Sequence, residues 1–269
     1  MKVVFEYSEG CQKHINQDVY GYKDHFFWVI DGATEVFANN YLSDSGDVYW
    51  VVQQLNKALL AGDTTVSLKE YVRNAISKVR YNALALVPRI CEIPENRLPT
   101  YSICCASYAD NSLEYLCLGD CSLFASNAPT IRYTDDRIYP FHLQVNKVKD
   151  QLRNDIEQYH SEVLKKVREI KQYINTESGY WIGTLNPDVV DHAICGKHRI
   201  ESGDRFLICS DGFRPSIDEA NMVLFKPSDI FRELELEQII IQQNISEKDF
   251  FNKTGIDISD DKTVLLIQL

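Results

Sequence analysis

The sequence of 269 residues has no uncharged apolar run near the roughly eighteen residues that a membrane-spanning helix needs. Its start, Met1 to Glu6, lacks the apolar segment and cleavage site of a secretory signal. Lysine and arginine number only 28 against 39 aspartates and glutamates, and no basic cluster stands apart from acidic neighbours. We therefore expect a cytoplasmic protein that binds neither membranes nor nucleic acid.

The eight cysteines offer little that suggests disulfides or zinc. Most lie inside apolar strand-like runs, where a thiol behaves as a small hydrophobic group. We see no paired Cys-x-x-Cys and no Cys/His zinc spacing, and we interpret the six histidines first as surface or core residues without metal-ligand spacing, with His14 as the one to watch. The pattern is typical of reduced thiols in the cytoplasm.

Hydrophobic residues make up 45% and charged residues 25% of the chain, as in an ordinary globular protein. Apolar alternation predicts strands at 2–7, 18–22, 26–30, 100–109, 113–118, 122–126 and 130–133, with more strand and turn over 179–208 and a last strand after Asp261. Helical spacing predicts helices at 45–61, from the Ser67/Glu70 capping box to Pro88, over 145–174 as one or two helices, and at 228–243 and 246–254. These segregated runs favour one α+β domain over 1–269 with largely antiparallel sheets.

Five short acidic motifs are the most informative feature that the sequence does contain. They are Asn16-Gln17-Asp18, Asp31-Gly32, Gly119-Asp120, Asp211-Gly212 and Asp260-Asp261. Three adjoin apolar strand-like runs, and carboxylates at strand ends lie at the rim of a core, where loops assemble sites. Clustered carboxylates need protons or cations, and Mg2+ and Mn2+ prefer oxygen ligands. Each Asp-Gly can also be read as only a turn.

The order of these motifs resembles that of the metal-dependent serine/threonine protein phosphatases of the type-2C family, in particular the compact bacterial members, over nearly the whole chain. The residues that carry the resemblance are Lys13, Asn16-Gln17-Asp18, Ile30-Asp31-Gly32-Ala33-Thr34, Thr100-Tyr101-Ser102, Leu118-Gly119-Asp120-Cys121, Cys209-Ser210-Asp211-Gly212-Phe213 and Asp260-Asp261-Lys262-Thr263-Val264. It implies a four-layer α-β-β-α sandwich of two mostly antiparallel sheets flanked by helical pairs. A variable helical insert would occupy about 134–180, and the protein would be a monomer.

The resemblance also implies two Mn2+ or Mg2+ ions and a weaker third. Asp31 would bridge the two metals, and the carbonyl of Gly32 would bind the second. Asp211 and Asp260 would be the remaining ligands of the first metal ion. Asp31, Asp211 and Asp260 are therefore the predicted catalytic residues. Asp120 with Asp211 would hold the third ion. The partner would be a phosphorylated protein, whose phosphoserine or phosphothreonine is hydrolysed by a metal-bridging hydroxide.

Other residues of the motifs have lesser predicted roles. Lys13 stands where the family has an arginine for the substrate phosphate, and it would bind phosphate as a point charge. We expect Asp18, Gln17 and Asp261 to act through water or local hydrogen bonds. His14 adjoins Lys13 and could enter the phosphate side of the site.

Three departures from the family pattern leave an alternative open. Gln17 replaces a glutamate, Ala33 stands where many members carry a proton-donating histidine, and Lys13 replaces an arginine. Separately, Cys121 replaces a serine by a swap that conserves volume. The alternative is a catalytically weak or silent module that uses the same fold for binding or regulation. A third reading is a metal-dependent hydrolase of a small phosphorylated molecule.

Overall fold

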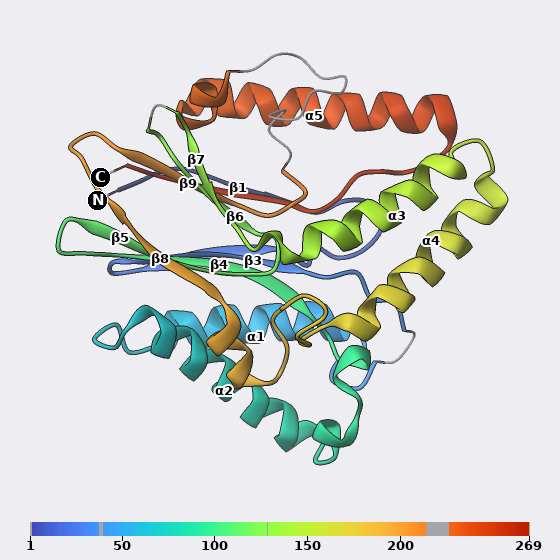
Figure 1. Cartoon of the computed structure of the whole chain (residues 1–269), viewed down its shortest axis with the longest axis horizontal. Helices are drawn as coiled ribbons and strands as arrows, with labels where there is room; N and C mark the ends of the chain where they lie inside the picture. The colour runs from blue at the N-terminus through green and yellow to red at the C-terminus, as the bar shows by residue number, and fades with distance from the viewer. Residues whose placement is uncertain (1, 38–39, 128, 214–225, 269) are drawn as a thin grey trace.

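The computed structural model describes residues 2–37, 40–127, 129–213 and 226–268. Two antiparallel five-stranded sheets lie face to face, with helices on their outer faces (Figure 1). The predicted α+β sandwich is therefore confirmed. Among the described residues, no helix is both long and apolar enough to cross a membrane.

The first sheet has the order β1-β10-β9-β6-β7, so the two ends of the chain pair at one edge of the fold. Its strands are β1 (Lys2–Glu9), β10 (Lys262–Gln268), β9 (Arg205–Cys209), β6 (Ser122–Ala125) and β7 (Ile131–Tyr133). The second sheet has the order β2-β3-β4-β5-β8. Its strands are β2 (Val19–Lys23), β3 (Phe26–Gly32), β4 (Tyr101–Ala109), β5 (Ser112–Leu118) and β8 (Ile194–Arg199).

Strand β3 shows how the continuous apolar runs serve two cores at once. Phe27 and Val29 pack between the two sheets, whereas Phe26, Trp28 and Ile30 pack against the helices on the outer face. Alternate side chains of a strand point to opposite faces, so a strand covered on both sides must be apolar throughout. The run ends at Asp31 because there the chain leaves both cores, and this places the carboxylate at the end of the sandwich.

Helices α1 (Asp47–Ala61) and α2 (Leu68–Leu86) cover the second sheet, and α5 (Glu233–Thr254) covers the first. The Ser67/Glu70 capping box of α2 is present as predicted. The prediction of two final helices was wrong: Ser246 does not cap a new helix but donates its hydroxyl to the Gln242 carbonyl inside α5. In the described residues, one long α-helix, α5, and not a pair of helices therefore covers the first sheet.

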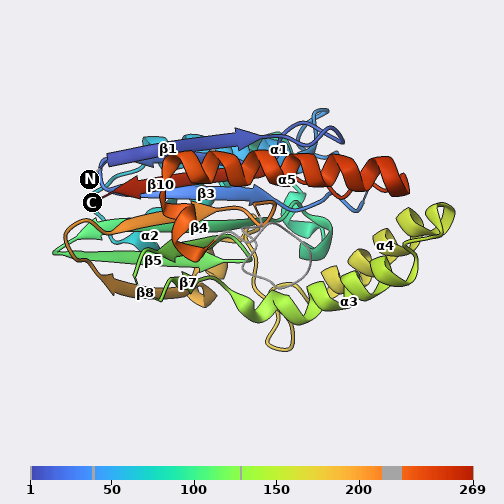
Figure 2. The ribbon, with the colours of Figure 1, turned by 90° about the horizontal axis from the view of Figure 1, so that it is seen from above.

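The predicted insert contains two helices, α3 (Tyr139–Gln151) and α4 (Ile156–Ile170), which extend from the end of the sandwich opposite the chain termini (Figures 1 and 2). Ile138, Ile170, Ile174, Tyr180 and Ile182 form its small core, against which Ala33 packs. The insert therefore lies directly beside the end of β3. Short 3-10 helices at Ile90–Glu92, Glu95–Arg97, Asp136–Ile138, Lys171–Tyr173, Pro187–His192 and Pro227–Phe231 complete the connections.

Candidate metal centre

The acidic motifs come together at the end of the sandwich that carries the insert. Asp31 is the second-last residue of β3 in the second sheet, while Asp211 follows β9 of the first sheet and Asp260 precedes β10. The backbone N–H of Asp211 donates to Oδ2 of Asp31 over 3.3 Å, which joins the two sheets at this point. Residues about 180 positions apart in the chain thus meet through the packing of the sheets.

The carboxylates are close enough to change one another's ionisation. Burial raises the pKa of Asp31 well above its ordinary value, and the charges of Asp18, Asp211, Asp120 and Asp260 raise it further. Burial likewise raises the pKa of Asp18 to about 8; a hydrogen bond from Ser210 lowers it in part, and three neighbouring carboxylates raise it. The end of the sandwich therefore holds more negative charge than it can keep ionised by itself.

The residues present fit divalent cations. Oδ2 of Asp18 is buried and has no hydrogen-bond partner among the described residues. Within that same part of the chain, no lysine or arginine forms an ion pair with Asp18, Asp31 or Asp120. A set of carboxylate oxygens without a matching cation is the donor set that Mg2+ and Mn2+ prefer. Asp18, to which the sequence assigned only an indirect role, lies inside this set.

Asp120 lies in the turn between β5 and β6, and two side chains from other elements contact it. Ser102 on β4 donates its hydroxyl to Oδ1 over 2.5 Å. Nε2 of His142 on α3 lies 3.4 Å from Oδ2. Sequence reasoning gave His142 no function, and no local signal could have indicated one, because only the packing of the insert brings α3 to this turn.

Lys13, Gln17 and Asp261 lie at the same end of the fold. The Lys13 ammonium donates to the Ser259 carbonyl and lies 3.8 Å from Oδ1 of Asp257. The backbone N–H of Gln17 donates to Oδ2 of Asp261 over 2.7 Å. Asp261 thereby holds the loop between β1 and β2 against the start of β10.

Gly212 allows the chain to pass very close to the last acidic motif. A Cβ at this position would lie 1.8 Å from the carbonyl oxygen of Asp261, a backbone atom that cannot move aside. The approach of Asp211 to Asp260 therefore depends on a residue without a side chain.

We expect Gly212→Ala to destabilise the protein by about 3 kcal/mol, because the clash forces the backbone apart. Thermal or denaturant unfolding measures this change. Gly203→Ala is the matched control: Gly203 has φ +92° but a Cβ there would meet nothing within 4 Å, so it should cost only about 1 kcal/mol of conformational strain. If Gly212→Ala and Gly203→Ala lowered the free energy of unfolding equally, the close backbone contact at Gly212 would not be needed for stability.

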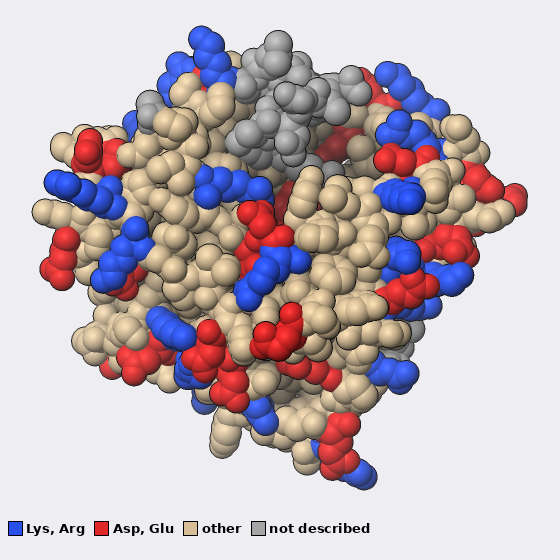
Figure 3. Space-filling model, viewed as in Figure 1, with Lys and Arg blue, Asp and Glu red and all other residues tan. Residues whose placement is uncertain are grey.

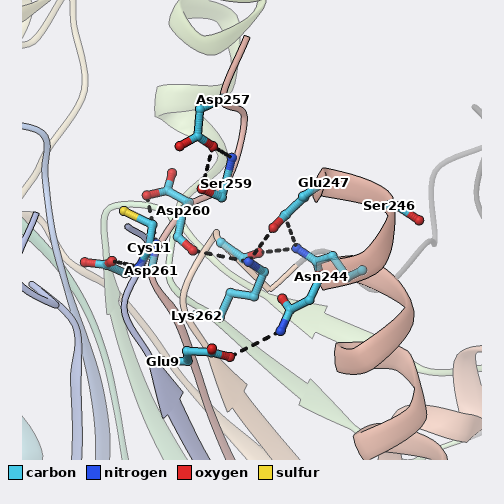
Figure 4. Close-up of polar contacts among 12 residues, drawn as sticks. Glu9, Cys11, Asn244, Ser246, Glu247, Asp257, Ser259, Asp260, Asp261 and Lys262 are labelled. Atoms are coloured by element: carbon cyan, nitrogen blue, oxygen red, sulfur yellow. Dashed lines mark hydrogen bonds and ion pairs between the residues drawn. The ribbon is translucent and has the colours of Figure 1, made fainter. Parts of the chain in front are cut away.

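A buried polar chain links α5 to both of the late acidic motifs, and Figure 4 labels the part of it formed by Glu247, Lys262 and Asp260. The side-chain amide of Gln243 donates to the Gly212 carbonyl over 2.6 Å and to Glu247 over 3.0 Å. Glu247 in turn forms an ion pair of 2.7 Å with Lys262, which also donates to the Asp260 carbonyl over 3.3 Å. Helix α5 therefore positions the backbone of both motifs through hydrogen bonds.

We expect Glu247→Ala to lower the free energy of unfolding by about 3 kcal/mol, because it leaves the ammonium of Lys262 buried without its carboxylate partner. The Lys262 side chain is only 5% exposed, so water cannot replace that partner. The control is Glu237→Ala, an exposed position on the same helix, which should change stability by less than about 0.5 kcal/mol. Similar effects of the two substitutions would contradict a structural role of the ion pair.

No family model matches the chain, and no curated protein matches it. Several solved structures match the chain over nearly its whole length. The Mycobacterium tuberculosis serine/threonine phosphatase PstP/Ppp matches 98% of this chain and 97% of its own, with 16% identity and a TM-score of 0.54. PppA of Pseudomonas aeruginosa, a key regulatory component of T6SS, matches 98% and 96%, with 15% identity and a TM-score of 0.56.

The chain has the fold of the type-2C (PPM) phosphatases. The catalytic domain of PstP in complex with two manganese ions is a further match, with 16% identity, a TM-score of 0.51, and coverage of 98% of this chain and 97% of that one. On one face of this type-2C fold, basic and acidic side chains are interspersed, and acidic atoms lie set back in a hollow (Figure 3). No broad basic patch is visible on that face.

Proposed function

We propose that this protein is a Mn2+- or Mg2+-dependent phosphatase that hydrolyses phosphoserine or phosphothreonine in a protein. The observation that carries the proposal is the convergence of carboxylates from both sheets at one end of a type-2C fold, where a buried oxygen of Asp18 has no hydrogen-bond partner among the residues that the structure describes. Neighbouring structures with this fold are described as serine/threonine phosphatases, and one of them holds manganese.

In this proposal the carboxylates hold the metal ions. One ion would be bound by Asp31 and the Gly32 carbonyl. The other ion would be bound by Asp31, Asp211 and Asp260. Asp120 and Asp211 would hold a weaker third. Bound cations would supply an activated water at neutral pH and neutralise charge on the transferring phosphoryl group. The mutual effect of these carboxylates on the pKa of Asp31 supports the assignment, because it requires them to be near neighbours.

Lys13 would hold the substrate phosphate. Its pairing with Asp257 is compatible with that role, since the two side chains are 41% and 33% exposed. Exposed ion pairs of this kind contribute about 1 kcal/mol or less, so a phosphate dianion can compete for the ammonium. The insert packed against Ala33 stands beside the site, and we propose that it selects the phosphoprotein substrate.

The test is hydrolysis of p-nitrophenyl phosphate and of a phosphothreonine peptide by the purified protein. Activity should depend on Mn2+ or Mg2+ and disappear with excess chelator. Turnover that persists in chelator would exclude the proposed chemistry, and a preference for small phosphorylated molecules over peptides would exclude the proposed substrate class.

The alternative, a silent module with the same fold, rests on Gln17, which removes a charge beside the predicted second ion. Calorimetric titration with Mn2+ separates the two possibilities. Binding together with turnover supports the enzyme, whereas the absence of binding at millimolar metal supports the silent module.

A further inference from the structure

A second group of potential metal ligands lies beside the carboxylate centre, and it differs from that centre in chemistry. Cys11 and His14, both in the loop between β1 and β2, meet Asp261 at the start of β10. One ligand atom from each of these three residues lies within 4.8 Å of the other two. We call this group the Cys11–His14–Asp261 triad.

This group was not predicted from the sequence. Cys11 and His14 are three residues apart, which by itself is not a Cys/His zinc pattern. Two ligands alone are a weak signal. The third comes from a residue 250 positions further along the chain than Cys11, and only the pairing of β1 with β10 brings it near.

The imidazole of His14 is oriented as in a metal ligand. Its Nδ1 lies 3.0 Å from the Ile15 carbonyl oxygen and 3.6 Å from Oδ2 of Asp261. Because both of these oxygens are acceptors, we assign the N–H to Nδ1 and the free lone pair to Nε2. Nε2 then faces Sγ of Cys11 at 3.5 Å. Zinc-bound histidines commonly donate their second N–H to a backbone carbonyl in this way.

The distances also suit a tetrahedral site. With a Zn–S bond of about 2.3 Å and a Zn–N bond of about 2.0 Å, two ligands of a tetrahedron lie about 3.5 Å apart. The observed separation of Sγ and Nε2 is 3.5 Å. This pair therefore needs little movement to bind one ion.

Asp261 is a fixed carboxylate, whereas its two partners are accessible from solvent. Its Oδ1 accepts the Cys11 backbone N–H and its Oδ2 accepts the Gln17 backbone N–H, each over 2.7 Å. Each oxygen keeps a second lone pair for a metal. Asp261 is 4% exposed, His14 is exposed and Cys11 is partly exposed, which leaves a path for an ion. Figure 4 shows Cys11 and Asp261 side by side.

We propose that the Cys11–His14–Asp261 triad binds one Zn2+ ion, with water as the fourth ligand, at a site separate from the carboxylate centre around Asp31. Thiolate and imidazole ligands select zinc over Mg2+ and Mn2+, which prefer oxygen. The ion would tie the loop that carries Lys13 to the strand that begins after Asp260. This proposal does not depend on phosphatase activity.

The test uses Co2+ as a spectroscopic substitute for Zn2+ in the metal-free full-length protein. Cobalt bound to a thiolate gives a charge-transfer absorption band that carboxylate ligands cannot produce. We expect this band in the wild type, its loss on addition of one equivalent of Zn2+, and its retention in Asp31→Asn. His14→Ala should weaken Zn2+ affinity by about 100-fold or more, since even the partners of metal ligands contribute 10- to 100-fold.

Cys11→Ser should abolish the band, and Cys91→Ser, which changes an exposed cysteine outside the triad, should leave it unchanged. Circular dichroism of each variant checks that the fold is intact. The absence of a thiolate–cobalt band in the wild type would overturn the proposal, as would a band that survives Cys11→Ser.

Discussion

Asp31→Asn is expected to lower metal-dependent phosphatase activity by about 1,000-fold or more. The carboxylate of Asp31 lies close to four other carboxylates and accepts a hydrogen bond from the opposite sheet. Asparagine keeps the shape of the side chain but removes the charge that holds cations. A loss of about 4 kcal/mol of transition-state stabilisation corresponds to that factor. The measurement is kcat/KM for a phosphothreonine peptide at saturating Mn2+.

Two controls separate lost chemistry from lost structure. Asp44→Asn changes an exposed aspartate outside the site and should keep wild-type activity. The metal-free Asp31→Asn protein should be at least as stable as the wild type, because one buried charge is removed from a crowded set. A folded Asp31→Asn variant with wild-type turnover would rule out Asp31 as a metal ligand of the active centre.

The metal-free protein is expected to lose stability as the pH rises from about 4 to about 8. The pKa of Asp18 is about 8 in the folded protein, against an ordinary value of 3.8. Below pH 4 the group is protonated in both states. Between these values the unfolded chain releases the proton while the folded protein retains it, so unfolding becomes easier. For Asp18 alone the loss is on the order of 5 kcal/mol, and the raised pKa of Asp31 acts in the same direction.

Denaturant unfolding in chelator at pH 5 and pH 8 measures this effect. Asp18→Asn should reduce the difference in unfolding free energy between pH 5 and pH 8, since its amide has no proton to lose. At pH 8 this variant should be more stable than the wild type. Mn2+ should stabilise the wild type more at pH 8 than at pH 5, because the carboxylates that bind it are then ionised. The same pH dependence in wild type and Asp18→Asn would refute the buried, charge-crowded state of Asp18.

Local patterns predicted most of the secondary structure for identifiable reasons. The run before Asp31 is apolar on both faces, and the Ser67/Glu70 pair caps α2 because both contacts lie within one turn. The failure at Ser246 has an equally local cause. A serine can cap a helix or bond to a carbonyl four residues earlier within one, and the sequence alone does not choose between them.

Neighbours across the fold could not be predicted in the same way. His142 reaches Asp120 only because the insert folds back onto the β5–β6 turn. Asp18 lies buried among the other carboxylates because the sheets meet where β2 begins, and its own sequence motif does not indicate that burial. Such contacts depend on packing between segments that are far apart in the chain, and neither segment's sequence indicates that the other lies beside it.

The sequence by itself determined which residues stand at strand ends, and so which aspartates could reach the rim of the core, because alternation and turns are properties of a few adjacent residues. The tertiary structure decided which of those aspartates share one site. It also decided that Asp261 instead anchors the loop of Cys11 and His14. The physical reason is that the pairing of β1 with β10 and the contact between the two sheets join residues about 180 to 250 positions apart, at separations that no local pattern encodes.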